Sequence, residues 1–143
     1  MMRRILNHKS GGFTLIELVL VIAVLGILAV VALPQFINVS TKAKQASRDG
    51  VAGAVRSGIS LYRANDLVAN GPPGNYPAAL DAEAAGATAG PANLFFGNAL
   101  QQGIADGAWS KTGANVYVFN DGSATYTYTY TPGTGAFTSP TAP

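Results

Sequence analysis

The side chains that could carry out catalytic chemistry are few and lie far apart in the sequence. The chain of 143 residues has a single histidine, His8, no cysteine, and seven scattered carboxylates. An acid–base pair, an activated nucleophile or a metal site would need such groups at characteristic spacings or gathered on neighbouring elements. The pair Asp121-Gly122 is typical of a hairpin turn rather than of a calcium ligand. We therefore expect no enzyme, no metal site and no cofactor.

Glu17 is the carboxylate in the most unusual position. It directly precedes the segment from Leu18 to Leu33, in which twelve Leu, Ile or Val residues are separated only by Ala and Gly. A carboxylate beside or within hydrocarbon is costly and is by default a candidate functional residue. A polar group in an apolar seam can set the alignment of packed helices. Alternatively, a position at a helix start would be stabilised by the helix dipole and by interfacial water.

The segment from Leu18 to Leu33 is long and apolar enough for a membrane-spanning helix. Its twelve large apolar residues contribute on the order of −5 kcal/mol to insertion. Arg3, Arg4 and Lys9 precede it, which favours a cytoplasmic N-terminus. The composition agrees, because only 11% of the residues are charged. By its residues alone, the segment is compatible with a signal anchor, a cleaved secretory signal or a buried core helix.

The basic residues do not form a nucleic-acid footprint. The formal net charge of +2 includes three basic residues before Gly12, and without them the chain carries −1. A nucleic-acid-binding surface requires basic residues gathered on one face. We infer no specific nucleic-acid partner from the six that remain, Lys42, Lys44, Arg48, Arg56, Arg63 and Lys111.

The segment GFTLIELV, residues 12–19, resembles the prepilin peptidase recognition site of type IV pilins and type II secretion pseudopilins. The resemblance includes a short basic leader ending at Gly12, an aromatic Phe13, Glu17 four residues later and Pro34 twenty-one residues after Phe13. This combination is highly specific. The region up to about residue 60, including 36–39 and 50–58, is most similar to the mannose-sensitive haemagglutinin pilins.

The resemblance implies three parts of the chain. Residues 1–12 would be a leader cleaved between Gly12 and Phe13, and the new Phe13 amine would be N-methylated. Residues 13–36 would form the transmembrane and filament-core helix, and residues 37–143 the pilin head. Glu17 and Phe13 would be the assembly residues, with the Glu17 carboxylate neutralising the Phe13 amine of a neighbouring subunit.

The resemblance also implies partners and a location. The chain would polymerise with itself into a helical filament, after processing by prepilin peptidase and with an inner-membrane assembly platform. A secretin would take part in a two-membrane cell. The precursor would lie in the inner membrane and the product would be an extracellular or periplasmic filament at the cell surface. Adhesion, motility or DNA uptake would then arise from the whole fibre.

Two other functions remain open at this point. A pseudopilin of a type II secretion system is built from the same helix and forms a short periplasmic piston. A membrane-anchored binding protein that never polymerises is the alternative from another class.

Gly26 and Pro34 are weak points of the apolar helix, because Gly costs about 1 kcal/mol and Pro about 3 kcal/mol relative to Ala in a helix interior. The resemblance implies that the helix is continuous in the membrane-held subunit and extended between these two residues in the filament. A plain proline kink is the alternative.

The chain after Pro34 becomes amphipathic, so a long helix is expected to cover the head with one face. The predicted apolar face repeats at spacings of three or four and consists of Val39, Ala43, Ala46, Val51, Ala54, Val55, Ile59 and Tyr62. Gly50, Gly53 and Gly58 are expected to allow close approach of packed elements. The Gly and Pro residues of segment 70–74 should end the helix.

The remaining sequence predicts a small antiparallel sheet. We expect a connecting loop over 78–92, a short helix from Asn93 to Gln102, and Trp109 in the core. Three strands are predicted over 115–120, 124–131 and 136–138, with turns at 121–122 and 132–135. The fold class is thus α+β and pilin-like, with a long N-terminal helix, apolar then amphipathic, packed on a sheet of about three or more strands.

Tyrosine and threonine alternate along the middle predicted strand. The pleat should place Tyr126, Tyr128 and Tyr130 on one face and the threonines on the other. Packing of the rings against the helix or across strands is the favoured interpretation of this stripe, over sugar binding or charge transport.

Overall fold

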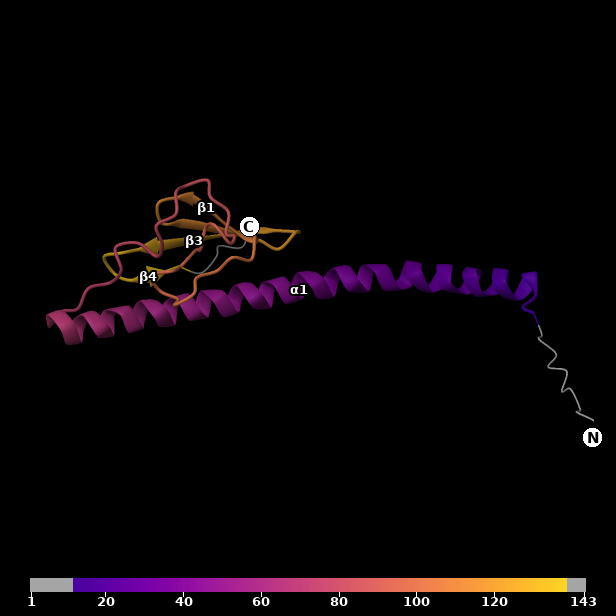
Figure 1. Ribbon diagram of the computed structural model, residues 1–143, viewed down its shortest axis with the longest axis horizontal. Coiled ribbons are helices and arrows are strands. Elements are labelled where there is room, and N and C mark those ends of the chain that lie inside the picture. Colours follow the sequence, from indigo (N-terminus) through magenta and orange to yellow (C-terminus); the bar gives the residue numbers. More distant parts are fainter. Residues whose placement is uncertain (1–11, 139–143) are drawn as a thin grey trace, which may run out of the picture. The chain divides into compact units, whose positions relative to one another are not determined.

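The computed structural model describes residues 12–138, so the predicted leader lies outside the described residues except for Gly12. Within this range the chain forms one helix and four strands (Figure 1). They are α1 (Leu15–Asn70), β1 (Trp109–Gly113), β2 (Val116–Asn120), β3 (Thr125–Thr131) and β4 (Ala136–Phe137). The α+β class predicted from the sequence is confirmed. The chain divides into two compact units between Val39 and Ser40, which are described in turn.

The first unit contains the apolar half of α1. Pro34 lies inside the helix, which continues through both Gly26 and Pro34. The side chains from Leu15 to Val39 are exposed apart from the half-buried Ala32. The most apolar 18-residue window of α1 has a mean hydropathy of 3.1, so by length and composition the helix could cross a membrane.

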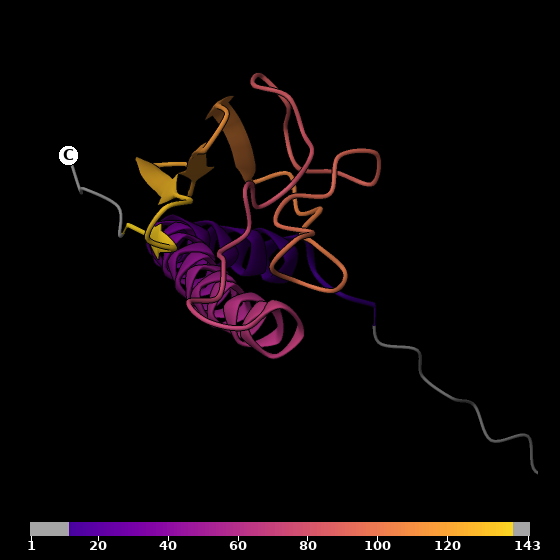
Figure 2. The same ribbon diagram turned by 90° about the vertical axis from the view of Figure 1, so that its left-hand side faces the viewer.

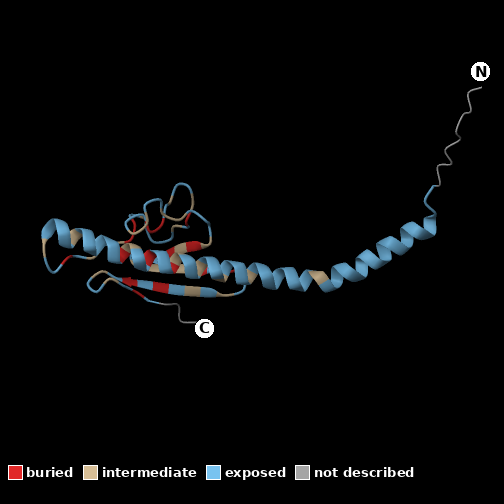
Figure 3. Ribbon diagram, turned by 90° about the horizontal axis from the view of Figure 1, so that it is seen from below, coloured by how far each residue is buried: buried red, intermediate tan, exposed pale blue. Residues whose placement is uncertain are grey.

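The second unit, residues 40–143, is called the head below. Its part of α1 buries Ala52, Val55 and Ile59 against the other elements of the head. Figure 2 shows the strands and loops on one side of this part of α1, and Figure 3 shows the buried residues on that side. The helix ends at Asn70 as predicted, because Gly71 adopts a positive φ of 82° and its N–H bonds back to the Leu67 carbonyl at 3.0 Å.

The predicted apolar face of the helix was only partly right. Val55 and Ile59 are buried and Val51 is half-buried, but Ala52 was missed. Five predicted members are exposed instead: Val39, Ala43, Ala46, Ala54 and Tyr62. The reason is that the rest of the head contacts only a narrow stripe of the helix. Spacings of three and four residues, applied to the whole segment, select a wider face than this buried stripe.

The four strands form an antiparallel sheet in the order β1-β2-β3-β4. Trp109 pairs with Phe119, and Phe119 pairs with Tyr126, which fixes the register across three strands. Gly122 and Gly135 have φ of 95° and 68°, so glycine suits both connecting turns. The predicted turns at 121–122 and 132–135 are confirmed.

One prediction for the head was wrong, and one strand was not predicted. The segment from Asn93 to Gln102 is not a helix but a series of turns, because Phe95 pairs with Ile104 and Phe96 has a positive φ of 62°. The strand that was not predicted is β1. Its inward-facing positions are Trp109 and Lys111, and because Lys111 is charged, the sequence shows no alternation of apolar and polar residues there.

The core of the head is aromatic. Trp109 is fully buried, as predicted, and its ring centroid lies 5.2 Å from the ring centroids of both Phe119 and Tyr128. On β3 the three tyrosines are buried or half-buried and the threonines are exposed, which confirms the predicted faces. Tyr130 donates a hydrogen bond from its hydroxyl to the Pro77 carbonyl at 2.7 Å. The tyrosine stripe therefore packs in the core of the head.

Candidate functional site

The first turn of α1 holds Glu17 in a reciprocal cap with Thr14. The Thr14 amide and hydroxyl both donate to Oε2 of Glu17 at 2.8 Å, and the Glu17 amide donates to the Thr14 hydroxyl at 3.3 Å. This is a capping box, which satisfies free amides at a helix N-terminus and places the carboxylate at the positive end of the helix dipole. The helix-start interpretation of Glu17 is thus supported by direct contacts.

The cap leaves half of the carboxylate available. Both bonds from Thr14 go to Oε2, and Oε1 makes no hydrogen bond within residues 12–138. Glu17 is exposed, so Oε1 can accept from a donor outside this chain. An ammonium group is the strongest such donor for a carboxylate. Thr14 could have been recognised from the sequence, because the Thr-x-x-Glu spacing is a known signature of this cap.

The residues of the expected cleavage site lie directly before this turn. Gly12 and Phe13 precede the helix and are exposed, and the Phe13 side chain is 90% exposed. Nothing lies within 4 Å of the position a Cβ would take at Gly12. The two residues are therefore sterically accessible, while cleavage and methylation stay predictions.

Gly26 and Pro34, the expected weak points, both lie within continuous helix. Gly26 has open space around its missing side chain. This arrangement corresponds to the continuous helix expected for the membrane-held subunit. The extended segment expected in a filament stays a prediction.

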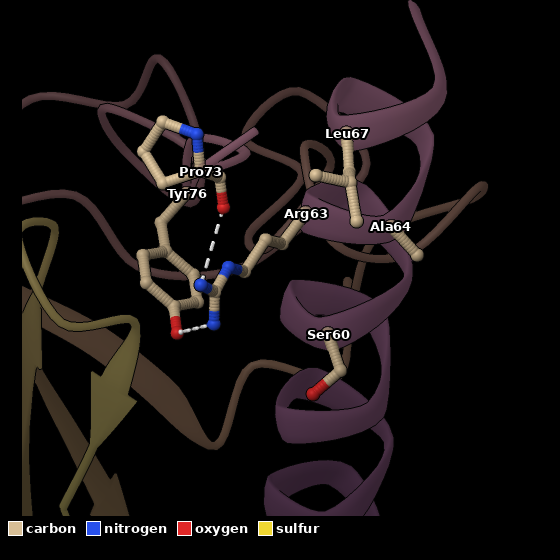
Figure 4. Close-up of a pocket in the computed structure, with 6 residues that line it drawn as sticks. All are labelled: Ser60, Arg63, Ala64, Leu67, Pro73 and Tyr76. Atoms are coloured by element: carbon tan, nitrogen blue, oxygen red, sulfur yellow. Dashed lines mark hydrogen bonds between the residues drawn. The ribbon is translucent and has the colours of Figure 1, made fainter. Parts of the chain in front are cut away.

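A groove of about 300 Å³ lies on the head between α1 and the loop after it. Figure 4 shows Arg63 reaching from the helix toward Tyr76 and Pro73. Its guanidinium donates to the Tyr76 hydroxyl at 2.7 Å and to the Pro73 carbonyl at 3.2 Å, and lies 4.8 Å from the Tyr76 ring centroid. Through these contacts Arg63 holds the loop against the helix.

Asp121 acts as a turn residue that ties the sheet to α1. Its Oδ1 accepts from the Ser123 amide at 2.8 Å and from the Ala124 amide at 2.7 Å, while Oδ2 accepts from Gln45 at 2.9 Å. The bonds from Gln45, Ala124 and Ser123 hold the pKa of the Asp121 carboxyl below its usual range. Residues 12–138 contain no group of three His, Cys, Asp or Glu that could hold a metal ion.

Comparison with known proteins identifies related chains. The family described as "Prokaryotic N-terminal methylation motif" matches residues 7–33. The chain is 32% identical to the fimbrial protein EcpC of Eikenella corrodens over 126 residues, which cover 82% of this chain and 81% of that protein. No solved structure matches the chain.

Two further relatives match over shorter stretches of the chain. The type IV narrow pilus major component PilA5 of Thermus thermophilus is 45% identical over 53 residues, 37% of this chain and 46% of that protein. The type IV major pilin protein PilA of Myxococcus xanthus is 51% identical over 39 residues, 27% of this chain and 18% of that protein. The chain thus spans less than half the length of these two relatives. The match to EcpC extends over both the helix and the head, and the chain belongs to the type IV pilin family.

Proposed function

We propose that this chain is the major structural subunit of a type IV pilus. In this proposal the leader, residues 1–12, is removed behind Gly12 and the new Phe13 amine is methylated. Residues 13–36 hold the subunit in the inner membrane until it polymerises into a surface filament. The names of the Thermus and Myxococcus relatives, a major pilus component and a major pilin, support the major-subunit role.

The exposed apolar surface of α1 is the observation that carries this proposal. None of its most apolar 18-residue window is buried within the chain. Large side chains such as Val30, Leu33 and Phe36 are 75%, 65% and 71% exposed. A continuous apolar surface of this size needs a cover other than water. Lipid supplies the cover before assembly, and the helices of neighbouring copies supply it in the filament.

Glu17 gives that packing its register. The Thr14 cap fixes the carboxylate through Oε2, so Oε1 can accept from the Phe13 amine of a neighbouring copy. A buried carboxylate left without a partner is strongly disfavoured, and pairing it with an ammonium removes most of that cost. Only copies aligned so that this pair forms would therefore leave the membrane.

The remaining partners follow from this pathway. Prepilin peptidase would cleave the bond between Gly12 and Phe13, which the structure leaves exposed. An inner-membrane assembly platform would extract the helix from lipid. In a two-membrane cell the growing fibre would cross the outer membrane through a secretin.

The proposal is tested by replacing Glu17 and, as a matched comparison, Thr14. We expect Glu17→Ala to insert into the membrane and lose its leader but to yield no filaments, because the register pair is missing. Thr14→Ser keeps the capping hydroxyl and should assemble normally, whereas Thr14→Ala should assemble poorly. Sheared surface material is imaged, and its N-terminal mass is measured for a methylated Phe13. Normal filaments from Glu17→Ala would refute the register pair.

A further inference from the structure

Lys111 and Asp81 form a buried ion pair in the head, away from the residues that carry the proposed function. The Nζ and Oδ1 atoms are 2.5 Å apart, and the two side chains are only 3% and 1% exposed. Lys111 follows Trp109 at the next inward position of β1, so the pleat turns both side chains into the core. The Lys111 backbone bonds to Gly86 and Ala87 of the loop beside β1. The fold therefore holds the amine against the carboxylate.

The surroundings of the pair match those of a secondary amide. Nζ also donates to the Glu83 carbonyl at 2.7 Å, and Oδ2 of Asp81 accepts from the Phe96 amide at 3.2 Å. An amide has one N–H and one carbonyl, and the site offers it one acceptor and one donor in these places. The Tyr117 ring, with its centroid 5.3 Å from Nζ, forms an apolar wall.

We propose that Lys111 and Asp81 condense into an intramolecular isopeptide bond. A proton passes from the ammonium to Oδ1, and the freed Nζ lone pair attacks Cγ of Asp81. The Cγ–Nζ bond forms and the Cγ–Oδ1 bond breaks, so Oδ1 leaves as water with two of the three ammonium protons. The third proton stays on the amide nitrogen facing Glu83, and Oδ2 becomes the carbonyl oxygen facing Phe96. No other reactant is needed.

The site favours this condensation in three ways. The reaction removes two charges from a place where water does not solvate them, which relieves the desolvation cost of the pair. The Phe96 amide stabilises the negative charge that develops on Oδ2. Burial, together with the neighbouring Asp81 carboxylate, raises the pKa of Tyr117, so its hydroxyl stays protonated and can donate a hydrogen bond to the Asp81 oxygens.

The test is the mass of the purified full-length chain measured in denaturant, which breaks an ion pair but not an amide. We expect the chain to be lighter than its sequence by one water molecule. Trypsin should fail to cut after Lys111 and should release residues 64–143 as one fragment lacking that water. Lys111→Arg should restore the sequence mass, whereas the matched control Lys44→Arg should keep the loss.

Two results would overturn the proposal. One is wild-type protein at its full sequence mass, a measurement that does not depend on whether the Lys111→Arg variant folds. The other is a water loss confined to fragment 112–143 with free cleavage after Lys111. That result would place the loss at Asp121-Gly122, where cyclisation of an Asp-Gly pair to a succinimide removes the same mass.

Discussion

Replacing Gly58 by alanine should destabilise the head, whereas the same change at Gly53, five residues earlier on α1, should not. A Cβ at Gly58 would overlap the backbone carbonyl oxygen of Ala99 and lie 2.7 Å from the carbonyl carbon. At Gly53 nothing lies within 4 Å of that position. Each substitution gains up to about 1 kcal/mol of helix propensity. Overpacking against rigid backbone costs up to about 3 kcal/mol, so the net loss at Gly58 is about 2 kcal/mol.

The single tryptophan, Trp109, makes this prediction measurable, because it is fully buried in the head. Thermal unfolding of the full-length chain in detergent is followed by its fluorescence. The free-energy difference of up to about 3 kcal/mol between the two variants corresponds to a Tm difference of roughly 10 °C. Gly53→Ala should melt at or above the wild-type temperature. If the two variants melted together, the close approach of α1 to Ala99 would be refuted.

Two further predictions concern polar groups of the head. Because the pKa of Asp121 is lowered by folding, the stability it contributes is present above the ordinary carboxyl pKa of 3.8 and is lost as the pH falls below it. The stability gap between wild type and Asp121→Asn in urea should therefore shrink on acidification; a constant gap would contradict this. Tyr130→Phe should cost about 1–3 kcal/mol, because it leaves the buried Pro77 carbonyl unpaired. Tyr126→Phe is the half-buried control, and equal losses would contradict the assignment.

The helix and the hairpins could be predicted from the sequence because their signals are local. The apolar run after Glu17, the Gly71 stop and the alternation along β3 each depend on neighbouring residues. The hypothesis that Glu17 is an assembly residue also rests on a local signal, the lone carboxylate beside the apolar run. Its partner Thr14 was equally local, and only the spacing of three residues had to be noticed.

The rest of the head depends on contacts between distant segments. Phe96 adopts its positive φ where Phe95 pairs with Ile104, an arrangement that helix propensity does not anticipate. Lys111 looks like a surface lysine until Asp81, thirty residues earlier, is placed beside it. The three helix glycines were all expected to allow close approach, yet among them only Gly58 faces a neighbouring backbone.

The alternation of tyrosine and threonine along β3 separates positions where substitution alters stability from positions where it does not. Tyr128 and Tyr130 are fixed by the rings and carbonyls around them, so a change there alters the stability of the whole head. Thr125, Thr127 and Thr129 lie on the opposite, exposed face of the strand. Antigenic and chemical character on this face can therefore drift from one lineage to another while the fold beneath it stays unchanged.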